Sequence, residues 1–356
     1  MKKRVLSFVL ALGMCVGLAA CGQKEADGAG EEGVASGEKI TVRIATQHPD
    51  DYPSSQAMMK LAEDLEERSG GVLECDVYTN NALGGELDIL DQARTGTVEI
   101  IYCSPTAATM NPKINVFDLP FLFENYEQVE KVVSNEELMD EILGEFVNYG
   151  IRPMAAYENG LRVISTNKKI ESLAELKGLK MRVPQAPISI AIFNALGCNA
   201  TPIAFNELYS ALQQKVVDGQ ENGYPTFSTN RYYEVQDYIA ETYHMWSINE
   251  LFVSEVFWQK LTPELQEIVE TACKESGVYQ RTLYREMQDA CKQEAVDNGV
   301  EMSGRRPRKA CTRTSMPSMS GARSWYRKFW TAQTADKTKG CCGVYSSCLQ
   351  SGKKGP

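Results

Sequence analysis

The sequence predicts an α/β protein with mainly parallel sheets. From Lys39 onward, short apolar segments typical of strands alternate with amphipathic segments typical of helices, which is the pattern of parallel α/β folds. The chain of 356 residues is also long enough for two lobes of ordinary size. Its content of 43% hydrophobic and 24% charged residues is that of a globular protein, and it excludes wholesale disorder, collagen and a polytopic membrane protein.

The first strand and helix can be justified residue by residue. Residues 40–45 alternate apolar and polar side chains and predict the first strand. Ser54 or Ser55 can cap the helix that follows, and the pair Gly70-Gly71 ends it. The inner face of this helix is predicted to consist of Met58, Leu61, Ala62 and Leu65.

The same alternation continues along the chain to about residue 298. The further predicted strands are 72–78, 98–102, 152–157, 161–166, 180–183 and 200–203. The further predicted helices are 86–94, 126–133, 135–149, a short one capped by Ser172, 188–196, 206–215 and a long one at 263–298.

Charge and motifs exclude several classes of function. A net charge of -10 argues against a nucleic-acid binder, which normally carries a basic face. His48 and His244 are the only histidines, so a multi-histidine metal site is excluded. The sequence holds no serine-hydrolase elbow, phosphate-binding P-loop, dinucleotide fingerprint or zinc-protease motif. No catalytic set, cofactor or metal is therefore predicted.

Cysteines outside the two ends of the chain are interpreted as packing residues. They form no CxxC pair and are odd in number, and the set is Cys75, Cys103, Cys198, Cys273 and Cys291. Free cysteine behaves as a small buried hydrophobe, so no structural disulfide is predicted.

The N-terminus has the features of an export signal. Lys2, Lys3 and Arg4 precede an apolar run that is too short for a transmembrane helix and suits a signal peptide. The run ends in LAACG at 18–22, which resembles the bacterial lipobox and makes Cys21 the predicted lipid attachment site. Residues 22–38 are almost wholly small or charged and predict a flexible linker. An exported protein anchored to a membrane by lipid alone is therefore expected.

The last part of the chain differs in composition from the rest. Residues 303–356 hold 12 Lys/Arg and a single acid, Asp336, and they show no helical or strand period. An abrupt change of this kind is what an out-of-frame translation produces, so this atypical basic tail is interpreted as a frameshift and is given no function. A basic arm for anionic surfaces is the alternative.

Four neighbouring motifs carry most of the functional information. They are GLKMRVP at 178–184, ALGCNATP at 195–202, FNELYSALQ at 205–213 and VDGQEN at 217–222. In these motifs the chain resembles the extracytoplasmic solute receptors of tripartite ATP-independent periplasmic (TRAP) transporters, the DctP-like family. Weaker agreement, including Gly84-Gly85-Glu86, covers most of residues 39–302 and is expected to stop there.

The resemblance implies a two-lobed, periplasmic-binding-protein-like fold that closes on a ligand, as a Venus flytrap does. Crossing strands and a long lobe-spanning helix would join the lobes. Lobe one is expected to take residues 39–158 with a returning segment at about 248–287. Lobe two is expected to take residues 159–247 with the helices to about 302.

The strongest candidate for a ligand contact is Arg182. It lies at the end of a predicted strand just before Pro184, where open α/β sheets place their ligands. A guanidinium meets a carboxylate with two parallel hydrogen bonds, and in the resembled family the arginine of this motif grips the substrate carboxylate. The resemblance also implies ligand roles for Asn222, Arg162 and Phe205. The alternatives are a salt bridge for either arginine and a plain core position for Phe205.

Candidates for discrimination come from lobe one and from the returning segment. Gln47 and His48 follow the first strand, and Tyr102 and Ser104 follow the strand at 98–102. His244 and Glu250 bracket the return crossing, where they could meet hydroxyl groups of a ligand.

The function implied is a receptor that captures an organic acid and delivers it to a membrane permease without catalysing a reaction. The alternatives are a secreted enzyme acting on a carboxylated substrate and a ligand-sensing partner of a membrane receptor. The lobe-one candidates offer hydroxyl, amide and imidazole groups but no permanent positive charge. Because an unpaired buried charge is costly, a sugar acid such as a hexuronate is predicted over a C4-dicarboxylate, with sialic acid as another alternative.

Overall fold

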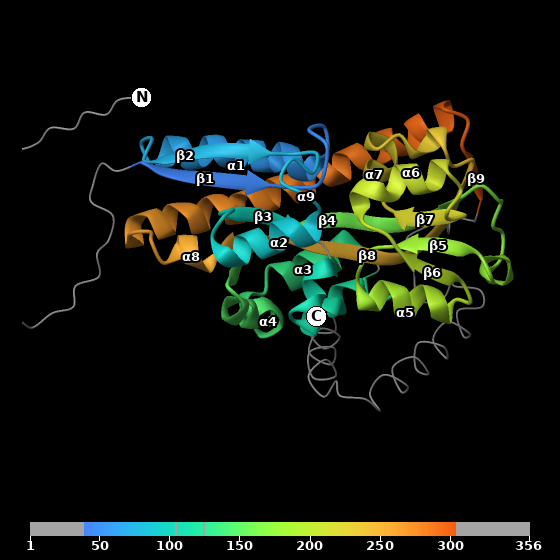
Figure 1. The fold of residues 1–356 in the computed structure, drawn as a ribbon, viewed down its shortest axis with the longest axis horizontal. Coiled ribbons are helices and arrows are strands. Elements are labelled where there is room, and N and C mark those ends of the chain that lie inside the picture. The colour runs from blue at the N-terminus through green and yellow to red at the C-terminus, as the bar shows by residue number, and fades with distance from the viewer. Residues whose placement is uncertain (1–38, 104, 124, 304–356) are drawn as a thin grey trace, which may run out of the picture. The chain divides into compact units, whose positions relative to one another are not determined.

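The structure, a computed structural model, describes residues 39–103, 105–123 and 125–303 (Figure 1). The predicted signal peptide, lipobox and linker, and the basic tail from residue 304 onward, lie outside the described residues. The described strands form one nine-stranded sheet of order β2-β1-β3-β8-β4-β7-β5-β6, with β9 beside β8. Five of the eight strand pairings are parallel, and the predicted α/β class is confirmed.

Lobe one is built on three neighbouring strands, β1 (Ile40–Ala45), β2 (Leu73–Tyr78) and β3 (Ile100–Cys103). Its helices are α1 (Pro53–Arg68), α2 (Glu86–Thr95), α3 (Tyr126–Val133) and α4 (Glu136–Leu143), with 3-10 segments η1 (Pro105–Thr109), η2 (Pro112–Asp118) and η3 (Gly144–Tyr149). The predicted helix at 135–149 thus ends early and continues as a 3-10 segment.

The start of α1 differs from the sequence prediction. Tyr52 is the N-cap and Pro53 the first helical residue, so the predicted cap at Ser54 or Ser55 is wrong. Proline suits the first helical position because its fixed φ is helical and its missing N–H is not needed there. The predicted inner face is confirmed, since Met58, Leu61 and Leu65 are fully buried and Ala62 nearly so.

Lobe two repeats the strand–helix alternation. Its strands are β5 (Lys180–Val183), β6 (Asn199–Pro202) and β7 (Gly219–Asn222), and its helices are α5 (Pro187–Ala195), α6 (Leu208–Gln213) and α7 (Tyr224–Thr229). Short 3-10 segments occur at η4 (Leu173–Leu176), η5 (Phe205–Glu207) and η6 (Tyr232–Glu234). Both neighbours of β5 run parallel to it, which places its carboxyl end beside that of β7.

Two long antiparallel strands cross from one lobe to the other, β4 (Ile151–Thr166) and β8 (Tyr238–Ser254). The sequence predicted separate strands at 152–157 and 161–166, and this is wrong. The chain passes through Glu158 and Gly160 as an irregularity in the pairing with β8, and Gly160 adopts a φ of +64°. A bulge at glycine bends a strand without ending it, which explains why one strand continues where the sequence predicted two.

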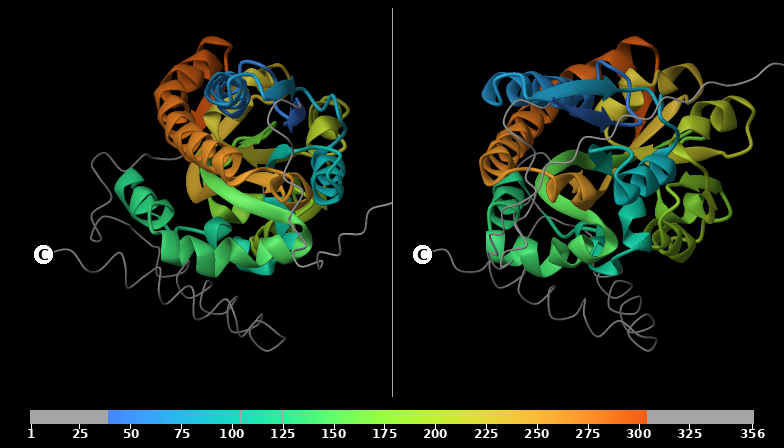
Figure 2. Two further views of the ribbon diagram at one scale, coloured as in Figure 1. Left: turned by 90° about the vertical axis from the view of Figure 1, so that its left-hand side faces the viewer. Right: turned by 60° about the vertical axis from the view of Figure 1, so that its left-hand side comes forward.

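The predicted long helix is α9 (Pro263–Asp297), and it packs against α1, α7 and β4 (Figure 2). Gln280 exchanges two hydrogen bonds with the backbone of Glu158, and the Tyr284 hydroxyl donates to the Asn159 carbonyl at 2.6 Å. A Cβ atom on Gly160 would lie 2.2 Å from the Tyr284 ring. Helix α9 therefore holds β4 at the point where it crosses between the lobes.

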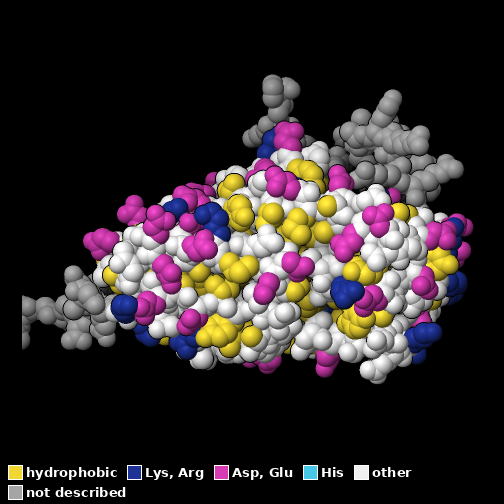
Figure 3. Space-filling view, turned by 90° about the horizontal axis from the view of Figure 1, so that it is seen from above, with side chains coloured by type: hydrophobic (Ala, Val, Ile, Leu, Met, Phe, Trp, Pro, Cys, Tyr) yellow, Lys and Arg dark blue, Asp and Glu magenta, His cyan; other side chains and the backbone are white. Residues whose placement is uncertain are grey.

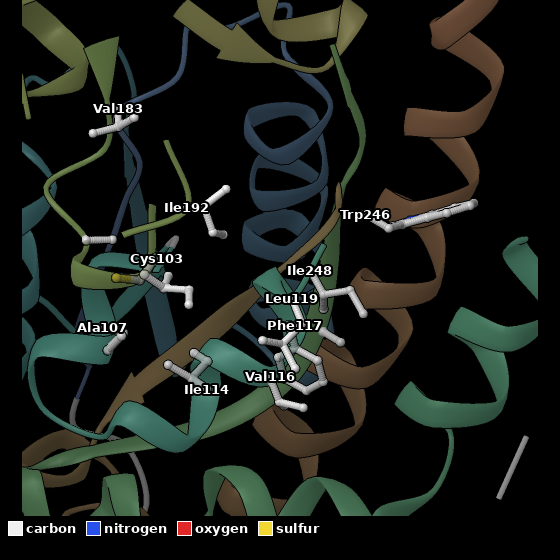
Figure 4. Packing of buried hydrophobic residues seen from close by; sticks show 14 of the residues in the cluster. Cys103, Ala107, Ile114, Val116, Phe117, Leu119, Val183, Ile192, Trp246 and Ile248 are labelled. Carbon is white, nitrogen blue, oxygen red and sulfur yellow. The ribbon is translucent and has the colours of Figure 1, made fainter. Parts of the chain in front are cut away.

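The largest apolar cluster joins the two lobes (Figure 4). It combines Ala107, Ile114 and Phe117 of lobe one with Val183 and Ile192 of lobe two. Two further apolar clusters lie under α1 and beside α7. Among the described helices, none is both long enough and apolar enough to cross a membrane.

Candidate ligand-binding site

Arg182 is a buried cation without an anionic partner among the described residues. It is the third residue of β5 and only 3% exposed. Its Nε donates to the Ile203 carbonyl at 2.9 Å, and no other hydrogen bond or ion pair of this side chain is formed within the described chain. Burial lowers the pKa of Arg182 to about 10, so the side chain stays protonated at neutral pH. Its two terminal amino groups remain as donors for an anion.

Arg162 lies in the same part of lobe two but is already neutralised. Its Nη2 donates to the Glu221 carboxylate at 2.8 Å and to Asn222 Oδ1 at 3.0 Å, and its Nε also donates to that carboxylate. Burial by itself would lower the pKa of Arg162, but Glu221 outweighs burial and raises it. Arg162 therefore forms a salt bridge, which is the predicted alternative to a ligand contact. Its Nη1 makes no hydrogen bond in the described chain.

Asn222 and His244 complete the surroundings of this ion pair. Asn222 accepts from Arg162 and donates to Gln220 Oε1 at 2.6 Å, so one amide N–H remains for a ligand. His244 Nε2 lies 3.5 Å from Glu221, and its Nδ1 shares a hydrogen bond of 2.8 Å with Thr242. Arg162 and His244 lower the pKa of Glu221 to about 2, against the raising effect of burial.

Two further acids act on the arginines, and sequence reasoning missed both. Asp118, the last residue of η2, is 2% exposed and interacts electrostatically with Arg162 and Glu221. Glu86, the first residue of α2, acts on Arg182 and also on Asp118 and Tyr102. The signal in the sequence that could have indicated Glu86 is its position at the start of a helix, directly after the Gly84-Gly85 pair.

Aromatic rings bring the lobe-one candidates to Phe205 of lobe two. His48 lies 5.0 Å from Tyr102 and 5.2 Å from Phe205 between ring centroids, the latter edge-on. Burial lowers the pKa of His48 to about 3, so the imidazole is neutral at physiological pH. Tyr52 adds a second contact between the lobes, because its hydroxyl donates to Asn159 at 2.7 Å and shares a hydrogen bond of 3.1 Å with Thr226.

The other candidates lie in different situations. Gln47 is buried, and its Oε1 has no hydrogen bond among the described residues. Glu250 is buried beside Cys103 and Ala156, its pKa is raised by burial, and Arg281 is the cation that acts on it. No hydrogen bond, ion pair or ring contact within the described chain joins Glu250 to Arg162 or Arg182. Ser104 lies outside the described residues, so its role stays a prediction.

One face of the molecule carries more acidic than basic side chains. The face seen in Figure 3 carries many acidic side chains and few Lys or Arg. Because like charges repel, the charge of this face does not attract a carboxylate, and the buried Arg182 is a local positive charge inside the protein.

Comparisons with known proteins identify the family of the chain. The family described as bacterial extracellular solute-binding protein, family 7 (DctP) matches residues 44–320. The match extends past residue 302, so the expectation that the resemblance stops there is wrong.

Individual proteins with bound ligands are similar to the chain. It is 26% identical to the sugar acid binding protein of Advenella mimigardefordensis in complex with galactonate, with a TM-score of 0.81 over 88% of this chain and 99% of that one. It is 28% identical to a TRAP periplasmic solute binding protein of Pseudomonas putida F1 with bound D-glucuronate, with a TM-score of 0.77 over 87% and 97%.

A relative with a different printed ligand is also similar. The C4-dicarboxylate-binding periplasmic protein of Rhodobacter capsulatus is 29% identical over 270 residues, which cover 75% of this chain and 80% of that protein. The shared feature of these proteins is an acidic ligand. The chain therefore belongs to the DctP family of bacterial extracellular solute-binding proteins, and it is a solute receptor of the TRAP type.

Proposed function

We propose that this receptor captures a sugar acid, such as a hexuronate or an aldonate, by its carboxylate. The observation that carries the proposal is the buried Arg182, which has no carboxylate partner in the described chain. A buried unpaired cation is unfavourable, and an anionic ligand with a planar carboxylate would relieve it through two parallel hydrogen bonds. Phe205 would pack on the ligand, and the free N–H of Asn222 and Nη1 of Arg162 would add donors.

The charges around Arg182 favour hydroxyl groups over a second carboxylate. Arg162 is the other nearby cation, and Glu221 already neutralises it. The remaining ionisable groups that act on Arg182 and Arg162 include the acids Glu86 and Asp118. Neither acid offers a positive charge to a second carboxylate, whereas these acids and the neutral Gln47, His48 and Tyr102 can all exchange hydrogen bonds with hydroxyl groups. Two similar solved structures contain galactonate and D-glucuronate.

Binding is proposed to favour the arrangement in which the lobes touch. His48 and Phe205 meet only when lobe one contacts lobe two, and a ligand held by Arg182 would reach lobe one in the same arrangement. A membrane permease would then distinguish the ligand-bound receptor by its shape and receive the ligand unchanged. The chain acts as a carrier in this proposal and not as an enzyme.

Calorimetry with the purified chain tests the ligand class. D-Glucuronate, D-galacturonate and D-galactonate are expected to bind with micromolar or lower dissociation constants, and succinate and malate much more weakly. Recovery of each acid after incubation, measured by mass spectrometry, is expected to show no conversion. Tight binding of a C4-dicarboxylate with no heat from any sugar acid would overturn the ligand class, and a converted acid would favour an enzyme.

The N-terminal motif supports a proposed lipid anchor. Cys21 follows Leu18-Ala19-Ala20 and precedes Gly22, as in a lipobox. Cys21→Ser is expected to abolish incorporation of labelled fatty acid, while a matched control, Cys75→Ser, retains it. Labelled fatty acid in the Cys21→Ser protein would show that the anchor is elsewhere or absent.

A further inference from the structure

Four buried polar side chains form a chain of hydrogen bonds from Asp118, which acts on Arg162, to Tyr102. The Ser247 hydroxyl lies 3.2 Å from Asp118 Oδ1 and 3.4 Å from Asn249 Oδ1. Asn249 Nδ2 donates to the Tyr102 hydroxyl oxygen. All four residues are at most 2% exposed, so solvent water does not reach these groups to replace a missing hydrogen bond.

The number of protons decides the direction of this chain. Ser247 has one hydroxyl proton but faces two acceptor oxygens, on Asp118 and Asn249. If Asp118 is ionised, it accepts the hydrogen bond of the Ser247 hydroxyl, and the Asn249 carbonyl loses its donor. If Asp118 is protonated, it donates to Ser247, and Ser247 donates to Asn249. With the Asn249 amide oriented so that its Nδ2 donates to Tyr102, only the protonated form of Asp118 gives the Asn249 carbonyl a donor.

The far end of the chain is a hydroxyl donor. Tyr102 accepts from Asn249, and its own O–H makes no other hydrogen bond within the described chain. A phenol that already accepts one hydrogen bond keeps its proton to donate. The Tyr102 ring lies 5.0 Å from His48, which in turn contacts Phe205. Tyr102 therefore offers a donor next to the residues assigned to the ligand.

We propose that Asp118 is a positioning residue. Its proton sets the direction of the hydrogen bonds of Ser247 and Asn249, and this relay fixes Tyr102 as a hydrogen-bond donor to an oxygen of the ligand. The inference rests on the proposed function, because it assigns the recipient of that hydrogen bond to a sugar acid. Affinity then depends on pH through a group that does not touch the ligand.

The surroundings of Asp118 allow it to hold a proton near neutrality. Arg162 of β4 and the hydrogen bond from Ser247 of β8 favour the ionised carboxylate, whereas Glu221 of β7 and Glu86 of α2 oppose it. His244, also on β8, interacts with Glu221. Burial is the largest effect and raises the pKa of Asp118 to about 7.

The binding test measures dissociation constants of D-glucuronate and D-galactonate between pH 6 and 8. With a pKa of about 7, loss of one required proton raises the wild-type dissociation constant about tenfold over this range. Asp118→Asn keeps a donor toward Ser247 at every pH, so its affinity is expected to be flat. Tyr102→Phe is expected to bind more weakly and also without pH dependence. Equal slopes in wild type and Asp118→Asn would overturn the proposal.

A control separates this proton from that of another buried carboxyl with a raised pKa. Burial raises the pKa of Glu158 to about 7, and Glu158 bonds to Trp246 and Arg285 where β4 crosses between the lobes. Glu158→Gln is expected to keep the wild-type slope of affinity with pH. A slope that disappears in Glu158→Gln and persists in Asp118→Asn would assign the proton to the crossing and overturn the relay.

A ligand-free measurement distinguishes failure of the relay from failure of the proposed function. Carbon-13 NMR of the Asp118 carboxyl is expected to titrate near pH 7, and the Tyr102 ring carbon bonded to oxygen is expected to follow with the same midpoint. Ser247→Ala breaks the chain and should leave the Asp118 titration without the Tyr102 response. A Tyr102 signal that ignores pH in the wild type refutes the relay, whichever acids the receptor binds.

Discussion

Arg162 and Arg182 lie in the same lobe, are equally buried at 3% exposure, and have opposite electrostatic surroundings. Arg162 meets a carboxylate from the neighbouring strand and its pKa rises, whereas Arg182 meets only the Ile203 carbonyl and its pKa falls to about 10. Burial acts on both in the same direction, so the presence of Glu221 makes the difference. The comparison separates a cation that the protein itself neutralises from one that, in our proposal, a ligand neutralises.

The largest expected effect comes from removing the partner of Arg162. Glu221→Gln leaves a buried guanidinium without its carboxylate, and loss of one member of a buried pair costs about 3–5 kcal/mol of unfolding free energy. Denaturant unfolding measures this loss. The control is Glu255→Gln, because Glu255 pairs with Arg152 at 2.9 Å but both side chains are partly exposed, and a loss of at most about 1 kcal/mol is expected. Equal losses in the two variants would remove the distinction between the arginines.

The dependence of stability on pH should have two limbs with different sources. Arg162 lowers the pKa of Glu221 to about 2, so its contribution is present above the ordinary glutamate pKa and is lost as pH falls toward 2. Burial raises the pKa of Asp118 to about 7, so its contribution is present below the ordinary aspartate pKa and is lost as pH rises through 7. A tenfold change in proton affinity between the folded and unfolded chain corresponds to about 1.4 kcal/mol, so each limb is an effect of a few kcal/mol.

Two variants assign the limbs in denaturant unfolding between pH 2 and 8. Glu221→Gln is expected to flatten the acidic limb, and Asp118→Asn is expected to reduce the fall toward pH 8. Glu158 also contributes to that fall, because its pKa is about 7. A profile in which Glu221→Gln changes only the neutral limb would contradict the assignment.

The third prediction concerns Arg182 itself. Arg182→Lys keeps the charge but loses the planar pair of donors, and sugar-acid affinity is expected to fall by about 1.5–3 kcal/mol, the contribution of a charge-assisted hydrogen bond. Arg182→Met should lose more affinity but no unfolding free energy, because it removes a buried charge that has no partner in the described chain. Calorimetry and denaturant unfolding measure the two quantities. Unchanged affinity in both variants would exclude Arg182 as the carboxylate contact.

Local patterns in the sequence were sufficient for most elements of the fold. The strands at 40–45 and 180–183 and the long helix from Pro263 are predicted by their periodicity and by the proline that opens the helix. The continuity of β4 was not predicted, and no strand was predicted over the residues of β8, because the two strands depend on pairing with each other far along the chain. A single sheet shared by both lobes is also a property of that long-range pairing.

The site was predictable to the extent that its residues lie at strand ends or in a motif. Arg182 has both signals, and the structure finds it buried and without a carboxylate partner in the described chain. The pairing of Arg162 with Glu221 was not predicted, although Glu221 lies in the VDGQEN motif, because the motif does not show which side chain faces β4. Asp118 carries no local signal, since its place depends on η2 packing against β8.

The smallest effect should come from the ring contact that connects the region of Arg182 to lobe one. Phe205 lies two residues after the carbonyl that holds Arg182, and its ring meets His48 edge-on at 5.2 Å. Such aromatic pairs contribute about 0.5–1.5 kcal/mol beyond their buried area. The contact forms only when the lobes touch, so Phe205→Leu is expected to weaken sugar-acid affinity by about that amount. A double-mutant cycle with His48→Ala measures the coupling directly. A coupling near zero, with affinity still reduced by Phe205→Leu, would show that Phe205 acts on the ligand alone and that the ring pair does not help to hold the lobes together.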